Sequence, residues 1–274
     1  MSFWDMLTSH TKVAGGSLPL EQITLPVAAS SATTSSHSKC TWSSEERQLF
    51  KTASFITTCA RKLEVGSLVK SNACWLFYKF FSIVQLEHYD EYVVAMTCLF
   101  LASKIEETPV KIRDVINVAH RTLHPREPPL QIDQTYSSLV DTLINFELLI
   151  CRMLNFKLTY DYPHKYLLHY LKSLTEWMPA QHETEPYQRV AWSILNDCFS
   201  TKICIRNRPD QLALAACYLA LESCDIKVYM QEHAEKPWWK VFIEDIRLSD
   251  ISQLVAQILE MYENETAVTS FTVP

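Results

Sequence analysis

The chain has 274 residues, a formal net charge of −6 and a hydrophobic content of 48%, so it is long and apolar enough to bury a substantial core. The negative charge disfavours a nucleic-acid binder that works by neutralising phosphates, and the presence of only three glycines disfavours a nucleotide-binding sheet or a phosphate loop. No apolar run is long enough to span a membrane, and Met1–Leu7 lacks the layout of a secretory signal, so we expect an intracellular protein of the nucleus, the cytoplasm or both.

Residues 1–42 are predicted to form a disordered tail. Seven of the nine residues from Ser30 to Ser38 are serine or threonine, and no periodic apolar pattern surrounds them. Such a segment cannot bury enough surface to offset the conformational entropy that it would lose on ordering. We also expect a short C-terminal tail at residues 267–274, after the last helical pattern.

Five helical patterns follow the N-terminal tail and define a first domain at residues 43–158. Ser43 and Ser44 with Glu46 form a capping box for the first helix, and Asp90 is placed to open the third. The third helix is apolar on nearly every side, so we expect other helices to surround it. The predicted helices span residues 43–63, 67–81, 90–107, 111–123 and 136–155.

Five further patterns define a second domain at residues 159–266. They span residues 163–177, 186–201, 209–224, 237–246 and 249–265. A shift of 118 residues superposes the central helices of the two domains, so that Ala95 meets Ala213 and Ala102 meets Ala220. Small residues at matching places indicate that neighbouring helices approach both central helices closely. We therefore predict an all-α fold made of two tandem five-helix units.

Two charged residues of the first unit lie on apolar helix faces. Lys104 follows the apolar run Leu99–Ala102, and Glu147 lies within the run Ile144–Ile150. No cationic residue stands three or four positions from Glu147, so its partner must come from outside its own helix. One interpretation is that the two residues simply pair with each other, and a helix C-terminus favours a lysine in any case.

The second unit lacks both charges. The 118-residue shift places Glu222 at the position of Lys104, and aligning the closing helices places Val255 at the position of Glu147. The helical pattern is thus built a second time without either residue. This indicates a surface that the first unit alone uses.

Two segments around these residues resemble the signatures of the cyclin family. Leu101–Glu107 resembles the central helix of a first cyclin box, and Phe146–Phe156 resembles its closing helix. The resemblance covers about residues 45–265 and implies two tandem cyclin boxes. It also implies a non-catalytic regulatory subunit that binds and activates a cyclin-dependent protein kinase as a heterodimer.

The resemblance carries over to individual residues. In cyclins, a lysine and a glutamate at the two charged positions bind backbone groups beside the regulatory helix of the kinase, and apolar residues surround them. The implied kinase-binding set is Lys104, Glu147, Ile105, Cys151, Phe156 and Leu158. Four further segments resemble one small subgroup of the family: Tyr78–Phe81, Arg113–Val118, Pro163–Leu171 and Glu235–Trp239.

Two alternatives from other classes of protein remain open. A transcription factor with tandem cyclin folds would bind DNA, but it should be basic and usually carries a zinc ribbon. This chain is acidic, and its nine cysteines form no C-x-x-C pair. A helical-repeat scaffold without a kinase partner would show a period of roughly 33–47 residues, much shorter than the shift found here.

No catalytic, cofactor or metal site is predicted. The chain has no Gly-rich phosphate loop, no G-x-S-x-G motif and no His-Arg-Asp motif of a kinase, so neither an enzymatic activity nor a small-molecule substrate is expected. His120 and His124 share a helical face at the spacing of a zinc-binding pair, but Arg121 stands where a zincin has glutamate. We interpret the two histidines as a solvated, cationic helix end.

Overall fold

The computed structural model describes residues 42–178, 186–228 and 236–270. The predicted N-terminal tail, apart from its last residue, lies outside the described residues, as does the end of the predicted C-terminal tail at residues 271–274. Every regular element in the described ranges is a helix, which confirms the prediction of an all-α fold. Within them, no helix is both long and apolar enough to cross a bilayer.

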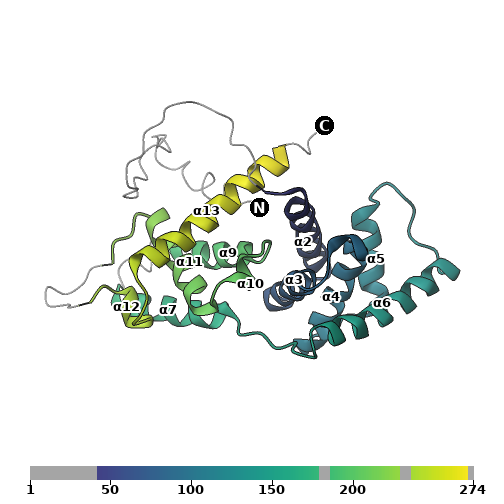
Figure 1. Ribbon diagram of the computed structural model, residues 1–274, viewed down its shortest axis with the longest axis horizontal. Coiled ribbons are helices and arrows are strands. Elements are labelled where there is room, and N and C mark those ends of the chain that lie inside the picture. The colour runs from purple at the N-terminus through teal and green to yellow at the C-terminus, as the bar shows by residue number, and fades with distance from the viewer. Residues whose placement is uncertain (1–41, 179–185, 229–235, 271–274) are drawn as a thin grey trace. The chain divides into compact units, whose positions relative to one another are not determined.

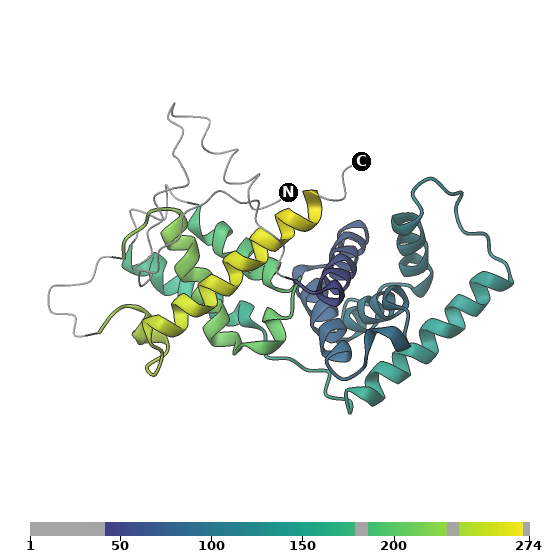
Figure 2. The same cartoon turned by 45° about the horizontal axis from the view of Figure 1, so that its top comes forward.

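The first set of helices surrounds a central one. It consists of α2 (Ser44–Lys62), α3 (Ser67–Phe81), the 3₁₀ turn η3 (Leu86–His88), α4 (Glu91–Ile105), α5 (Ile112–Leu123) and α6 (Gln134–Met153). The central helix is α4, which contacts α2, α3, α5 and α6 (Figure 1), and a second view shows the same grouping (Figure 2). Its residues from Val94 to Ser103 are all buried, because a helix that is apolar on nearly every side must be covered by neighbours.

The starts of α2 and α4 follow the capping signals of the sequence. The Ser43 hydroxyl accepts a hydrogen bond from the backbone N–H of Glu46 at 3.1 Å, and the Glu46 carboxylate accepts one from the Ser43 N–H at 3.2 Å. The Asp90 carboxylate accepts hydrogen bonds from the N–H groups of Tyr92 and Val93. These bonds satisfy N–H groups that have no partner inside the helix, so they fix both starts.

The second set of helices also has a central member. It consists of α7 (Pro163–Trp177), α9 (Tyr187–Cys198), α10 (Ile203–Arg206), α11 (Pro209–Ser223), α12 (Trp239–Phe242) and α13 (Leu248–Ser270). The central helix α11 contacts α7, α9 and α13. α13 continues to Ser270, beyond its predicted end at residue 265, because no glycine or proline stands between Glu265 and Ser270 to stop it.

The helix predicted at residues 237–246 is a single short turn, α12. Its C-cap residue Ile243 has extended backbone, with φ −136° and ψ 105°. Trp238, directly before the turn, is buried and stacks on Tyr218 of α11 with the ring centroids 6.2 Å apart. An aromatic anchor rather than a regular helix therefore attaches this segment to the second set.

The two sets repeat one pattern at the shift that the sequence indicates. α4 begins at Glu91 and α11 at Pro209, which are 118 positions apart, and both helices have 15 residues. Glu107 and Asp225, again 118 apart, follow these helices with left-handed backbone (φ 55° and 53°). The next N–H in each set donates to the carbonyl oxygen five residues earlier, at 3.0 Å after α4 and 2.9 Å after α11. Two copies of one helical unit, as predicted, account for this match; the domain limits at residues 43–158 and 159–266 stay a prediction.

Aromatic side chains join the two sets. The ring of Trp75 in α3 stacks on Tyr160 with the centroids 4.9 Å apart, and the Tyr78 hydroxyl donates a hydrogen bond to the carbonyl oxygen of Ser200. Phe199 of the second set is buried in the same apolar cluster as the core of the first. The two copies therefore share part of one core.

Candidate functional site

Lys104 and Glu147 form an ion pair at the surface of the first set. The Nζ atom of Lys104, in the last turn of α4, lies 2.7 Å from Oε1 and 2.9 Å from Oε2 of Glu147 in α6. The side chains are 43% and 20% exposed. The missing partner of Glu147 is thus a lysine on a neighbouring helix, and both groups remain accessible to another protein.

The aromatic ring of Phe100 supports Lys104 from within the same helix. The lysine Nζ lies 4.1 Å from the centroid of this ring, and Phe100, one turn earlier in α4, is buried. An ammonium group over an aromatic face is attracted by the negative potential of the ring. Lys104 is therefore held by a carboxylate on one side and a ring on another, which restricts the positions that its ammonium group can take.

Exposed apolar side chains flank Glu147 on α6. Ile144 is 51% exposed and Leu148 is 46% exposed, and they lie one helical turn apart on the same face. Exposed large apolar residues around a charged group are typical of a protein–protein interface. We call the surface made by Lys104, Glu147, Ile144 and Leu148 the α4–α6 face.

The other sequence-predicted residues differ in exposure. Phe156 is 65% exposed, and its N–H donates to the carbonyl oxygen of Cys151 at 2.8 Å. Cys151 is buried and lies one turn after Glu147. The pKa of its thiol is raised, mainly because the group is buried and secondly because the negative charge of Glu147 is near. Ile105 and Leu158 are half-buried and pack against the core of the first set. Of these four residues, Phe156 is the most available to a partner.

The sequence prediction omitted Phe100, Ile144 and Leu148. A signal existed for two of them, because Phe100 stands four residues before Lys104 and Ile144 stands three residues before Glu147. Leu148 directly follows Glu147, so spacing gave no signal for it. α4 has no clear polar face in its sequence, however, and α6 mixes exposed apolar residues into the polar stripe that contains Ser138, Asp141 and Asn145. Which of their apolar residues remain exposed depends on where the neighbouring helices pack.

The corresponding place in the second set carries no such pair. Glu222 takes the position of Lys104 and is exposed, while Val255, at the position of Glu147, is buried in α13. A buried valine offers no charge and no hydrogen-bonding group to another chain. The α4–α6 face is therefore specific to the first set, in agreement with the sequence comparison of the two units.

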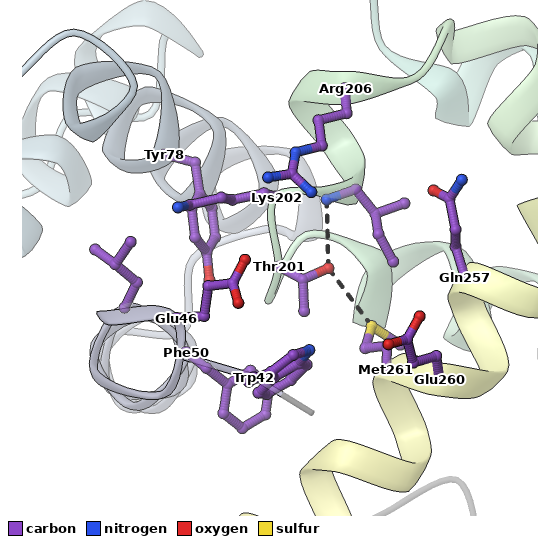
Figure 3. A pocket seen from close by; sticks show the side chains of 12 residues that line it. Trp42, Glu46, Phe50, Tyr78, Thr201, Lys202, Arg206, Gln257, Glu260 and Met261 are labelled. Carbon is purple, nitrogen blue, oxygen red and sulfur yellow. Dashed lines mark hydrogen bonds between the residues drawn. The ribbon is translucent and has the colours of Figure 1, made fainter. Parts of the chain in front are cut away.

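A cavity of about 240 Å³ lies among α2, α10 and α13 (Figure 3). Figure 3 shows Lys202 and Arg206 beside α10, with Glu260 and Met261 on α13 across from them. Acidic and basic side chains line the cavity together, and Lys202 also lies 3.8 Å from the carboxylate of Glu45. This mixture gives no charge bias that would indicate a ligand. The sequence did not predict the cavity, because its walls come from four distant segments, Tyr78 of α3 included.

The chain is similar to known proteins over most of its length. Residues 27–159 match the family model described as the cyclin N-terminal domain. Cyclin-K of Danio rerio is 27% identical over 233 residues, which cover 84% of this chain and 53% of that protein. Cyclin-L2 of Mus musculus is 35% identical over 191 residues, which cover 68% of this chain and 35% of that protein. The chain thus spans about half or less of the length of these curated relatives.

Solved structures share the fold. A chain of the yeast RNA polymerase II CTD kinase CTDK-1 complex superposes with a TM-score of 0.63 at 17% identity, over 82% of this chain and 68% of that chain. A chain of the yeast TFIIK (Kin28/Ccl1/Tfb3) complex superposes with a TM-score of 0.53 at 16% identity, over 79% of this chain and 86% of that chain. Similarity at this level of identity establishes the arrangement of the helices and nothing about binding.

Proposed function

Because the chain belongs to the cyclin family, we propose that it is a regulatory subunit, without enzymatic activity of its own, that binds and activates a cyclin-dependent protein kinase. The α4–α6 face and the neighbouring Phe156 are the proposed contact surface. The curated relatives are themselves named cyclins, and the CTDK-1 complex is named as a kinase, which supports a kinase partner for this chain.

One observation carries the proposal: the Lys104–Glu147 pair is exposed and keeps unused hydrogen-bonding capacity. A lysine ammonium has three N–H donors, and a carboxylate offers about four acceptor positions. The bonds between the two side chains, at 2.7 and 2.9 Å, leave capacity on both groups. Lys104 can therefore donate to a backbone carbonyl of a kinase, and Glu147 can accept from a backbone amide, without losing each other. The internal ion pair and the binding role are compatible.

Activation would follow from selective binding of one kinase conformation. A kinase is active when a glutamate on its regulatory helix pairs with the strand lysine that holds the ATP phosphates. A partner that binds the correct helix position more tightly than the retracted one shifts the equilibrium towards the active state. Ile144, Leu148 and Phe156 supply apolar area for this binding, at roughly 25 cal/mol for each Å² removed from water.

We further propose that the partner is a kinase of the cyclin-dependent kinase 10 type. The four subgroup segments resemble cyclin Q, a small cyclin that partners cyclin-dependent kinase 10. Two of them, Pro163–Leu171 and Glu235–Trp239, lie in the second domain, where general similarity among cyclins is weak, so they discriminate best. An intracellular location, in the nucleus, the cytoplasm or both, belongs to the same proposal.

The test is a binding titration of purified cyclin-dependent kinase 10 with the full chain and with Lys104→Ala and Glu147→Ala. Each substitution should cost about 2–5 kcal/mol of binding free energy, because the kinase groups opposite it lose their partner in a desolvated contact. Kinase activity at a fixed cyclin concentration should fall in parallel. Lys236→Ala is the matched control, since Lys236 also forms an exposed ion pair, with Glu244 at 2.9 Å, in the second set.

The outcomes test two hypotheses separately: that the α4–α6 face is the contact surface, and that the partner is cyclin-dependent kinase 10. Unchanged binding and activation by both variants, with helical content intact by circular dichroism, would reject the α4–α6 face as the contact. If a different cyclin-dependent kinase binds and both variants weaken it, the face stands and the assignment to cyclin-dependent kinase 10 is wrong.

A further inference from the structure

Two imidazoles and a carboxylate converge at the end of α5. His120 and His124 lie one turn apart on the same face, and Glu127 follows in the connection to α6. The ligand atoms of the three side chains all lie within 4.8 Å of one another. Nε2 of His120 is 3.9 Å from Oε2 of Glu127, and Nδ1 of His124 is 3.5 Å from Oε1. This is a set of metal-ligating groups that the kinase-binding face does not use.

The backbone holds the three side chains in place. The N–H of His124 donates to the carbonyl oxygen of His120 at 2.8 Å, which closes the last turn of α5. The N–H of Glu127 then donates to the carbonyl oxygen of His124 at 3.2 Å. This second turn brings the carboxylate back to the histidine pair. The sequence indicates the pair alone, and the turn adds the third group.

We propose that His120, His124 and Glu127 bind a divalent transition-metal ion such as Zn²⁺, with water in the fourth position. Zinc prefers imidazole nitrogen and carboxylate oxygen ligands at about 2.0–2.2 Å, and two histidines four residues apart on a helix can chelate it. A tetrahedral site with such bonds needs its ligand atoms about 3.3 Å apart. The three ligand atoms lie within 4.8 Å of one another, and each imidazole is 3.5 or 3.9 Å from one of the two Glu127 oxygens, so side-chain rotations that bring both imidazoles to one oxygen complete the site.

The surroundings allow an ion to enter and bind. The side chains of His120, His124 and Glu127 are 21%, 47% and 60% exposed, so solvent reaches all three ligands. The neighbouring cation Arg121 lies with Asn117 around a separate hollow. Hard ions such as Mg²⁺ favour all-oxygen coordination, so the two imidazoles select against them.

A bound ion would attach the connection between α5 and α6 to the end of α5. Glu127 belongs to this connection, which runs from residue 124 to 133, and α6 begins directly after it. An ion that binds only the folded chain stabilises the fold by an amount that rises with the logarithm of its concentration once that concentration exceeds the dissociation constant. The ion would thus steady the segment that leads into the helix carrying Glu147. The inference does not depend on the proposed kinase partner.

The first experiment is a Zn²⁺ titration of the full chain by isothermal calorimetry at neutral pH. We expect one ion for each chain, and a roughly tenfold or greater weakening in His120→Ala and in His124→Ala, with a smaller loss in Glu127→Gln. His88→Ala, which removes an exposed imidazole elsewhere in the first set, should bind as the parent does. Zn²⁺ should raise the melting temperature of the parent but not that of the His120→Ala/His124→Ala double variant.

A second measurement places the ion. Co²⁺ bound by nitrogen and oxygen gives visible d–d bands without a thiolate-to-cobalt charge-transfer band. Bands that appear in the parent and disappear in the double variant support the site. A charge-transfer band would place the metal on cysteines, and equal Zn²⁺ affinity of the parent and the double variant would place it elsewhere. Either result overturns the proposal, provided that circular dichroism shows the variants to be folded.

Discussion

The ring of Phe100 lies beneath the ammonium group of Lys104, with 4.1 Å between Nζ and the ring centroid. A buried residue of α4 thus contacts the charged group at the exposed end of the same helix. We expect Phe100→Leu to weaken kinase binding by about 0.5–1 kcal/mol, or two- to fivefold, because the lysine loses its aromatic support. The measurement is the same kinase titration as for Lys104→Ala.

A buried phenylalanine in the same core provides the control. Phe55 in α2 is 7% exposed, compared with 8% for Phe100, and its ring contacts Tyr92 rather than a lysine. Phe55→Leu and Phe100→Leu should each cost roughly 1 kcal/mol of folding stability. If both substitutions weaken kinase binding equally, general loosening of the core explains the effect and the support of Lys104 by the ring does not.

Exchanging the two charges separates the two interpretations of the ion pair. The double variant Lys104→Glu/Glu147→Lys restores an opposite-charge pair between α4 and α6. Its stability in urea should lie within about 1 kcal/mol of the parent, since an exposed pair contributes little. Kinase binding should stay as weak as in the single variants, because each position then offers the wrong charge to the kinase backbone. Recovery of binding would mean that the pair acts only within this chain.

The sequence predicted the parts of the fold that local chemistry decides. Ser43 and Asp90 cap helices in the structure because capping needs only a side chain and the next few N–H groups. The 118-residue repeat was also readable, since two central helices that must both be buried show matching patterns of small and apolar residues. The α12 turn was mispredicted, because the aromatic packing of Trp238 on α11 overrides the helical pattern there.

The candidate site depended on information that spacing alone does not contain. Lys104 and Glu147 are 43 residues apart, and their contact exists because α4 packs on α6. The sequence pointed to each charge separately and allowed a pair between them, and the resemblance to cyclins supplied the kinase-binding role. Glu127 could not be joined to the histidine pair from the sequence, because a turn after α5 brings it there.

The left-handed residue after α11 gives a stability prediction. Asp225 has φ 53°, a conformation that costs a residue with a Cβ atom about 1–2 kcal/mol. Asp225→Gly removes this strain but increases the freedom of the unfolded chain, so the net gain should be roughly 0.5–1 kcal/mol in urea denaturation. Asp225→Ala keeps the Cβ atom and should give no gain. Equal effects of the two substitutions would show that backbone strain at this position is unimportant.

Two carboxyl groups in the second set make stability depend on pH. Burial raises the pKa of Asp197 in α9, whose carboxylate accepts a hydrogen bond from the Tyr262 hydroxyl at 3.0 Å. The pKa of Glu265 in α13 is also raised, mainly because the group is buried and secondly because the negative charge of Asp197 is near. Above the ordinary pKa values of 3.8 and 4.5, the folded chain therefore holds more protons than the unfolded chain. The contribution of these two carboxyl groups to the free energy of unfolding is greatest at low pH. It is lost as the pH rises through the pKa values that the two groups have in the folded chain.

Asp197→Asn should flatten this dependence and stabilise the chain at neutral pH, because the neutral amide avoids burying a charge and its oxygen can still accept from the Tyr262 hydroxyl. The measurement is urea unfolding of parent and variant at about pH 5 and about pH 7.5, with the difference between them compared at each pH. The advantage of the variant should be larger at the higher pH. Asp245→Asn, at an exposed carboxylate before α13, controls for removal of a charge and should show no such increase. A variant that is less stable than the parent at both pH values would mean that the charged form of Asp197 is the one the fold requires.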